Sequence, residues 1–291
     1  MPTATINGID IYHELFGSGP PIFFVHGGYG GLATSLVPLD DSWVERFQDS
    51  YTVVTYDRRS AGKSSYPDTE HTLDLLTGDL VGLISHLNFP KSLIIGSSAG
   101  GPIAMNLALK HPDLISGLIL VNTSASIWSH PGRREATEEL QRRYNLLKEH
   151  GQEGAFDIIH QNGPEKRAFY LPPEGSGPRP PGKTQVAAQR ELRMRELTEA
   201  LSKEDRVRYE MGALRNQAAY LGVDLTSQLA EITHSTLVVH GDADTQVPYE
   251  LGKELSQNIP GASFVSISGA GHGLMGWEEA LSAIRTFCDS L

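Results

Sequence analysis

Short apolar runs alternate with longer segments of mixed character along both ends of the chain. The runs are rich in Val, Ile, Leu and Phe, which is typical of strands covered on both faces of a parallel sheet. The mixed segments repeat apolar residues every three or four positions, as amphipathic helices do. The pattern predicts strands at 3–6, 9–17, 22–28, 51–57, 91–96, 115–123, 235–242 and 262–268. It predicts helices at 39–50, 72–89, 99–112, 249–260 and 276–291.

The order of these elements predicts an α/β fold with a mostly parallel central sheet flanked by helices. The first two strands are an exception, because Asn7-Gly8 between them is a strong hairpin signal. Strand and helix stop alternating near Ser126, and up to Gly222 the pattern is helical and charged. We therefore expect a core domain of residues 1–125 and 223–291, with a helical cap of residues 126–222 inserted before the last two strands.

A segment rich in proline and glycine, residues 170–184, interrupts the expected cap. It is either a mobile flap or a surface connection. The expected cap also holds several aromatic and methionine side chains, which form either its own core or the wall of an apolar pocket. These residues are Trp128, Tyr144, Phe156, Phe169, Tyr170, Tyr209, Met211 and Tyr220.

Charge divides the 291-residue chain unevenly. The net charge is −11, but 16 of the 24 Lys and Arg residues and 14 of the 35 Asp and Glu residues lie between Ser126 and Gly222. This is consistent with a solvated helical layer over an acidic core. An acidic chain is poorly suited to nucleic acid or an anionic membrane, so we expect neither as a partner.

The lone cysteine, Cys288, excludes an internal disulfide and a cluster of cysteines around zinc. It lies on the apolar side of the last predicted helix, which indicates a buried thiol. The first residues alternate polar and apolar positions without a basic start and an apolar stretch, so no signal peptide is predicted. A cytoplasmic location is expected, and the protein is expected to be a monomer or a homodimer.

The stretch "LIIGSSAGG" at residues 93–101 carries the first candidate for chemistry. It fits Gly-x-Ser-x-Gly in one register, with Ser98 at the centre, because Ile95 stands where Ser97 would need a glycine. Between a strand and a helix, this pattern is typical of a strained turn that exposes a serine hydroxyl above the sheet. Ser98 is therefore the candidate nucleophile.

A serine hydroxyl needs a base and a group that orients the base. His272, in "SGAGHGLM", and Asp244, in "GDADTQVP", both follow predicted strands. Parallel strands bring such positions to one edge of the sheet, so we expect Ser98, His272 and Asp244 to form a triad. Asp242 is the alternative acid.

The glycine-rich stretch "FVHGGYGG" follows another buried strand. Glycines let backbone N–H groups approach a substrate, and such groups stabilise an oxyanion. We expect the oxyanion hole to consist of the N–H groups of Gly28 and Ala99. His26 is expected to brace this loop, and Tyr29 is a candidate substrate-binding residue.

The stretches "FVHGG", "YDRRSAGKSS", "GSSAGG", "GDADTQVP" and "GAGHG", in this order, resemble the α/β-hydrolase fold superfamily over nearly all of the chain except the cap. The resemblance implies that "YDRRSAGKSS" is a structural loop, in which Ser60 stands at a usual glycine, so Asp57, Arg58 and Ser64 are expected to be structural. The chain is also similar to proline iminopeptidases, but those have Pro-Gly where Tyr29-Gly30 stands here.

These residues predict a serine hydrolase that cleaves a small, apolar carboxylic ester or lactone through an acyl-enzyme, without metal or cofactor. A serine at the elbow disfavours the related dehalogenases and epoxide hydrolases, which use aspartate there. The same triad also serves hydrolases of C–C bonds and hydrolases of amides or N-terminal amino acids. A cofactor-free lyase is a further possibility. From another class of function, the fold also serves as a ligand receptor with little turnover. These alternatives remain open at the level of sequence.

Overall fold

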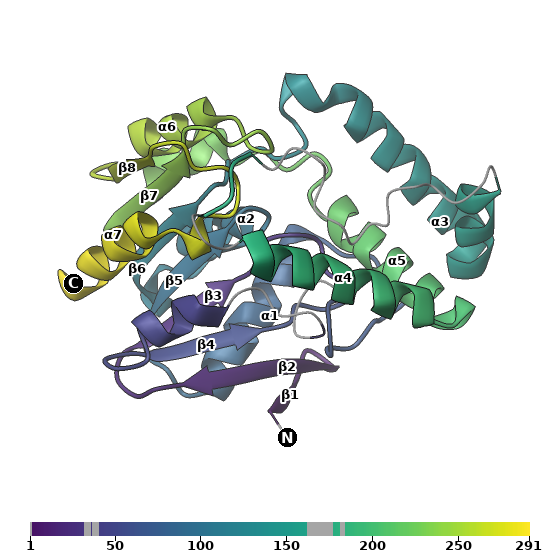
Figure 1. The fold of residues 1–291 in the computed structure, drawn as a ribbon, viewed down its shortest axis with the longest axis horizontal. Helices are drawn as coiled ribbons and strands as arrows, with labels where there is room; N and C mark the ends of the chain where they lie inside the picture. The colour runs from purple at the N-terminus through teal and green to yellow at the C-terminus, as the bar shows by residue number, and fades with distance from the viewer. Residues whose placement is uncertain (1, 32–35, 37–40, 162–176, 181–183) are drawn as a thin grey trace.

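Eight strands form one sheet in the computed structural model, which describes residues 2–31, 36, 41–161, 177–180 and 184–291 (Figure 1). Their order is β1-β2-β4-β3-β5-β6-β7-β8. The β1–β2 and β2–β4 pairs are antiparallel and all others are parallel, which confirms the expected mostly parallel sheet. The strands are β1 (Thr3–Ile6), β2 (Ile9–Phe16), β3 (Pro21–Val25), β4 (Thr52–Tyr56), β5 (Ser92–Ser97), β6 (Ile115–Val121), β7 (Thr236–Gly241) and β8 (Ser263–Ile267).

The β1–β2 hairpin has the turn that its sequence predicts. Asn7 and Gly8 both have positive φ, 50° and 78°. A two-residue turn of this type matches the right-handed twist of the paired strands, and asparagine and glycine tolerate its backbone conformation best.

Helices cover both faces of the sheet, and consecutive strand residues pack on opposite faces. Phe23 packs in the cluster that contains α1 (Leu73–His86) and α2 (Gly100–Lys110), whereas Phe24 packs in the cluster that contains α7 (Glu278–Asp289). The period of two in a strand explains this division. Helix α6 (Tyr249–Asn258) adds Leu255 to the first cluster, and Cys288 is buried in the second, as expected.

The structure differs from the prediction of a helix over residues 39–50. The structure has only a short 3-10 helix, η1 (Asp41–Arg46), followed by hydrogen-bonded turns up to Tyr51. Asp and Ser occur at both ends of this stretch, and their side chains compete for backbone hydrogen bonds and favour helix ends over helix interiors. The apolar residues Trp43, Val44 and Phe47 are buried all the same, in the cluster with α7.

Three helices lie between β6 and β7, where the cap is expected: α3 (Arg134–His160), α4 (Thr184–Ala200) and α5 (Lys203–Ala218). Figure 1 shows them grouped to one side of the molecule, away from the C-terminus. Helices α3 and α5 pack through an apolar cluster of their own, with Leu140, Leu147 and Leu214 among its members. The flap hypothesis concerns residues 170–184, of which 170–176 and 181–183 lie outside the described residues.

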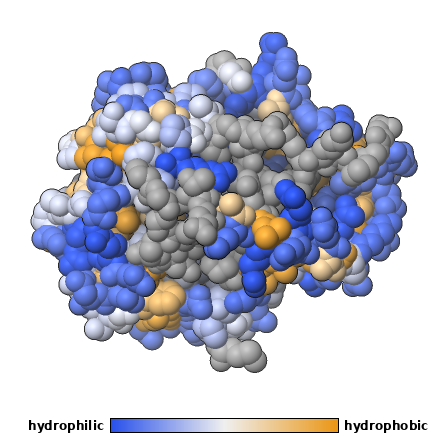
Figure 2. Space-filling view, in the orientation of Figure 1, coloured by the Kyte–Doolittle hydropathy of each residue, from blue (hydrophilic) through white to orange (hydrophobic). Residues whose placement is uncertain are grey.

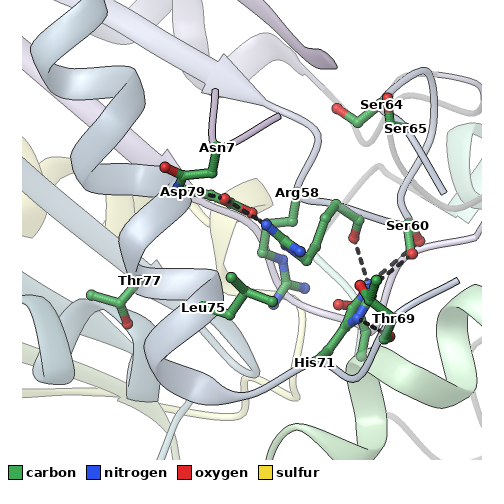
Figure 3. A network of polar contacts seen from close by, with 12 residues as sticks. Asn7, Arg58, Ser60, Ser64, Ser65, Thr69, His71, Leu75, Thr77 and Asp79 are labelled. Atoms are coloured by element: carbon green, nitrogen blue, oxygen red, sulfur yellow. Dashed lines mark hydrogen bonds and ion pairs between the residues drawn. The ribbon is translucent and has the colours of Figure 1, made fainter. Parts of the chain in front are cut away.

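The loop after β4 is buried and polar. Arg59 donates to both carboxylate oxygens of Asp79 at 2.6 and 2.7 Å, and the Ser60 hydroxyl lies 3.1 Å from Nε2 of His71 (Figure 3). Ser64 donates to the carbonyl oxygen of Asp57 at 2.6 Å. Ser60 has φ = 55°, a conformation that favours glycine, which agrees with the glycine that the family resemblance implies at this position.

On the face of the molecule shown in Figure 2, the described residues are largely polar, and the apolar ones lie in small patches. Among the described residues, the large apolar side chains that are exposed are Leu15, Leu192 and Leu291. No helix in the described part of the chain is both long and apolar enough to cross a membrane.

Candidate active site

The turn from β5 into α2 holds Ser98 in a left-handed conformation, with φ = 49°. The glycines around it are required for close packing. A Cβ on Gly96 would lie 2.7 Å from Cβ of Ala104, and one on Gly100 would lie 2.1 Å from the carbonyl oxygen of Val25. These clashes are the steric reason for Gly-x-Ser-x-Gly, and they leave Ser98 at the N-terminus of α2, where negative charge is favoured.

His272 lies within hydrogen-bond distance of both Ser98 and Asp244, so the three side chains form a chain of two contacts. Oγ of Ser98 is 2.9 Å from Nε2 of His272, and Nδ1 of His272 is 2.8 Å from Oδ2 of Asp244. The three side chains follow β5, β8 and β7, so the carboxyl ends of three strands bring them together. With Nδ1–H donating to the carboxylate, a neutral His272 presents Nε2 as an acceptor for the serine proton.

The Asp244 side chain is completely buried and held by its own loop. Its Oδ1 accepts hydrogen bonds from the backbone N–H groups of Gln246, at 2.8 Å, and Val247, at 3.0 Å. The alternative acid, Asp242, is exposed and accepts instead from the N–H of Gly269 at 2.6 Å. The structure therefore places Asp244, and not Asp242, against the imidazole.

Asn122 is a residue of this site that the sequence did not single out. It follows β6, is fully buried and has φ = 44°, a conformation that asparagine tolerates better than most residues. Its Nδ2 donates to the carbonyl oxygens of Gly271 and His272, at 3.1 and 2.5 Å, and its Oδ1 accepts from the N–H of Gly241 at 3.0 Å. The side chain thus fixes the His272 loop to the end of β7. A buried asparagine directly after an apolar strand was the available signal.

The two residues expected to form the oxyanion hole are both adjacent in the chain to groups that touch or carry the nucleophile. Ala99 follows Ser98 directly, and the Gly27-Gly28 loop crosses so close above it that a Cβ on Gly27 would lie 3.0 Å from Cβ of Ser98. Gly28 has φ = 67° and is exposed. The N–H groups of Gly28 and Ala99 have no hydrogen-bond acceptor within the described part of the chain. Their role as oxyanion donors remains a prediction.

A buried arginine and a tyrosine tie these two loops together. Arg58 donates through Nη1 to the Tyr220 hydroxyl at 2.8 Å and through Nη2 to the carbonyl oxygen of Gly28 at 2.5 Å. The Tyr220 hydroxyl donates in turn to the carbonyl oxygen of Ala99 at 2.6 Å. His26 accepts from Nε of Arg58 at 3.3 Å and donates to the carbonyl oxygen of Gly27 at 2.7 Å, so it braces the loop as expected. The brace contributed by Tyr220 was not expected from the sequence.

Two buried histidines make the stability of the fold depend on pH. Burial, together with Arg58, lowers the pKa of His26 to about 3, and burial, together with Arg59, lowers the pKa of His71 to about 4. In the unfolded chain both imidazoles titrate near 6.5. Because the unfolded state binds more protons below that pH, the free energy of unfolding should fall between pH 6.5 and 4, by about 1.4 kcal/mol per pH unit for each histidine.

Urea denaturation between pH 7.5 and 4.5 measures this dependence. We expect His71→Gln to reduce the slope, because the glutamine cannot be protonated. The exposed His111 provides the matched control, and His111→Gln should leave the slope unchanged. A free energy of unfolding that stays constant from pH 7 to pH 5 would contradict the prediction.

Tyr29 is half-buried beside the nucleophile loop. Its ring centroid lies 5.9 Å from that of Trp128 and 5.7 Å from that of Tyr220. Burial and the neighbouring Tyr220 raise the pKa of its hydroxyl. Substrate contact by Tyr29 remains a prediction. The position of Tyr29, between the glycine-rich loop and the start of the expected cap, favours it.

Of the other aromatic and methionine residues named for the expected cap, four pack against neighbouring side chains and two lie outside the described residues. Tyr144, Phe156 and Met211 belong to the apolar cluster between α3 and α5, and Tyr209 packs against Tyr66 with ring centroids 5.2 Å apart. These four therefore contribute to packing. Phe169 and Tyr170 lie outside the described residues.

Within the described ranges, no group of three or more His, Cys, Asp or Glu side chains is placed to hold a metal ion. The expectation that neither metal nor cofactor is needed remains a prediction.

Known proteins resemble this chain over almost its whole length. A putative carbamate hydrolase RutD from Caulobacter segnis is 27% identical over 282 residues, which cover 94% of this chain and 92% of that protein. A proline iminopeptidase from Saccharolobus solfataricus is 29% identical over 306 residues, which cover 98% and 91% of the two chains.

Solved structures show the same fold. The enol-lactonase from Burkholderia xenovorans LB400 superposes with a TM-score of 0.70 at 23% identity, covering 99% of this chain and all of that one. A thermophilic esterase from Thermogutta terrifontis has a TM-score of 0.70 at 25% identity, covering 100% and 97% of the two chains.

The family model and the curated relatives together support a hydrolase. Residues 22–284 match the model described as "Alpha/beta hydrolase family", and this chain therefore belongs to that family.

Proposed function

We propose that the protein is a serine hydrolase that cleaves a carboxylic ester or lactone through an acyl-enzyme intermediate. The observation that carries this proposal is the pair of contacts at His272, 2.9 Å to Ser98 and 2.8 Å to Asp244. A nucleophile, a base and a buried carboxylate in this order form the arrangement that activates serine in acyl transfer.

In the first half of the reaction, Oγ of Ser98 attacks the carbonyl carbon while Nε2 of His272 takes the serine proton. The buried carboxylate of Asp244 holds the imidazole in the tautomer that can accept this proton and stabilises the imidazolium that forms. His272 then protonates the leaving alkoxide, and the acyl group stays on Ser98. In the second half, His272 takes a proton from water while the water oxygen attacks the acyl carbon. His272 then returns this proton to Oγ of Ser98 as the bond between Oγ and the acyl carbon breaks, which releases the acid and restores the serine.

The oxyanion that forms in each half needs donors that are already in place. We assign this role to the N–H groups of Gly28 and Ala99, which belong to two separate loops, and the contacts of Arg58 and Tyr220 with the carbonyl oxygens of these residues hold the loops. Because these dipoles need no reorganisation during the reaction, each such donor contributes of order 3 kcal/mol.

The bond that is cleaved is the open part of the proposal. Relatives named as a carbamate hydrolase and a proline iminopeptidase favour an amide-type bond as a second candidate. An ester or lactone is the easier substrate for a Ser-His-Asp site, because the alkoxide leaves more readily than an amine.

We also propose that residues 126–222 form a cap over the core of residues 1–125 and 223–291, with Tyr29 against the substrate.

A fluorophosphonate probe tests the nucleophile, and a turnover assay tests the enzyme. We expect the probe to label Ser98 covalently, as located by peptide mass spectrometry, and a 4-nitrophenyl ester to be hydrolysed at a steady rate. Labelling without turnover of esters, lactones, diketones or amino-acid amides would favour a receptor of this fold. Labelling at another residue would contradict the proposed triad.

A further inference from the structure

A half-open pocket of about 240 Å³ lies between the segment that leaves β6 and the loop that follows β7. Ser124 lines it from the first segment, and Thr245 lines it from the second. Thr245 is the residue after Asp244. Ser124 is the residue after Thr123, whose hydroxyl donates to the carbonyl oxygen of Ser98 at 2.6 Å.

The pocket is therefore close to the proposed nucleophile, although the triad does not line it. Strands β5, β6 and β7 are neighbours in the sheet. The parallel strands end at the same edge of the sheet, so the segments that line the pocket and the turn that carries Ser98 leave the sheet on the same side. Arg133, which also lines the pocket, packs on Trp128, and the Trp128 ring centroid lies 5.9 Å from that of Tyr29, the residue after Gly28. A substrate that spans this distance can have its carbonyl at Ser98 and its other end in the pocket.

Arg133 supplies the permanent charge of this pocket. It ends the short helix η3 (Pro131–Arg133) and is half-buried. One Nη2–H donates to the carbonyl oxygen of Gln246, and the guanidinium lies 5.5 Å from the ring centroid of Trp128. No carboxylate in the described part of the chain lies within ion-pair distance of Arg133. A guanidinium has five N–H donors, and the bond to Gln246 uses one of those of Arg133; no described residue accepts from the other four.

The rest of the lining favours an anion with an apolar body. None of the described lining residues is acidic, although the chain as a whole carries a net charge of −11. His130 and the hydroxyl of Ser124 add further polar groups, and Ile127, Val247 and Leu251 form apolar surface. A partly desolvated guanidinium without a counter-ion is stabilised by a carboxylate, which it binds through charge-assisted hydrogen bonds.

We propose that this pocket binds a carboxylate of the substrate through Arg133, so that the enzyme acts on esters or lactones that carry a negative charge. The inference rests on the proposed hydrolase function and adds the chemical class of its substrate. It changes the expectation of a purely apolar substrate into an apolar body that ends in a carboxylate.

Two pairs of esters test the proposal. The first compares 4-nitrophenyl butyrate with the 4-nitrophenyl monoester of glutaric acid, and the second compares phenyl acetate with 4-acetoxybenzoate. We expect Arg133→Gln to lower kcat/KM about 10- to 100-fold for the charged member of at least one pair, mainly through KM, because charge-assisted hydrogen bonds are lost. The neutral members should change less than about threefold, and Arg133→Lys should retain part of the preference.

Arg134 is the matched control, because it is exposed and pairs with Glu138 on the surface. Arg134→Gln removes the same charge one residue away and should leave all four esters unaffected. Equal losses on charged and neutral esters in Arg133→Gln would assign Arg133 a purely structural role and overturn the proposal. Unchanged kinetics with all four esters would also overturn it.

Binding of glutarate to the Ser98→Ala protein, measured by calorimetry, separates this inference from the proposed reaction. If the wild type hydrolyses none of the esters, the proposed function fails. Glutarate binding alone then tests whether the pocket is a carboxylate site. Glutarate binding that Arg133→Gln abolishes and Arg134→Gln preserves would support the carboxylate site. No glutarate binding, together with no charge preference, would contradict it.

Discussion

Replacing Ser98 with alanine is expected to lower kcat roughly 10⁴- to 10⁶-fold while the protein stays folded. The hydroxyl is the attacking atom in the proposed mechanism, and its contact in the structure is with Nε2 of His272 at 2.9 Å. Loss of the nucleophile removes the acyl-enzyme pathway and leaves only the catalysis from oxyanion donors and binding. Alanine has the same backbone restrictions as serine at φ = 49°, so the elbow should persist.

Steady-state kinetics on a 4-nitrophenyl ester and thermal unfolding followed by circular dichroism measure the two parts of this prediction. Ser97→Ala is the matched control, because Ser97 is also half-buried in the same turn but does not contact the imidazole. It should keep activity within a few-fold of wild type. If Ser98→Ala retained more than a few per cent of the activity, Ser98 would not be the nucleophile.

The second large effect is expected from Asp244→Asn, which should lower kcat by about 10⁴-fold. The asparagine amide donates where the carboxylate accepts, so it favours the wrong tautomer of His272 and no longer balances the charge of the imidazolium. The buried carboxylate also accepts two backbone N–H groups. We therefore expect a moderate loss of stability, of about 1–3 kcal/mol, if the amide cannot replace all of these contacts.

Asp242→Asn makes the same chemical change two residues earlier in the chain. Because Asp242 is exposed and bonds to Gly269, this variant should keep activity within about threefold of wild type. The kcat of the two variants, measured on one ester, compares the two candidate acids directly. Comparable losses in both variants, or a larger loss in Asp242→Asn, would reject Asp244 as the orienting acid.

The positions of the candidate catalytic residues could be predicted because each follows a strand with a strong local pattern. Alternation of apolar strands and amphipathic helices predicts a parallel sheet, and a parallel sheet aligns its strand ends. That alignment is sufficient to bring Ser98, Asp244 and His272 to one edge, although 174 residues separate the first and last of them. The glycines at 96 and 100 were predictable for the same reason, because close packing at the turn excludes a Cβ.

The residues that hold these positions were not predictable in the same way. Asn122, Tyr220 and Arg133 act through contacts with residues far away in the chain, at Gly271, Ala99 and Gln246. A sequence pattern reports the neighbours of a residue along one helix or strand, and these contacts depend on how separate elements pack. The 3-10 helix at Asp41–Arg46 is a different case, because Asp and Ser in the local sequence already disfavour a regular helix there, and Trp43 and Phe47 are buried without one.

The sequence by itself thus determined the parallel sheet, the placement of a helical segment before the last two strands, and the residue types available for acyl transfer. Only the tertiary structure decided which aspartate meets His272 and which side chains brace the loops around Ser98. It also decided that Arg133, which has no ion-pair partner among the described residues, lines a pocket. The physical reason is the range of the forces involved. Periodicity and steric limits at a turn act within a few residues, whereas a hydrogen bond or a pocket requires groups from distant elements to lie within a few ångströms of one another.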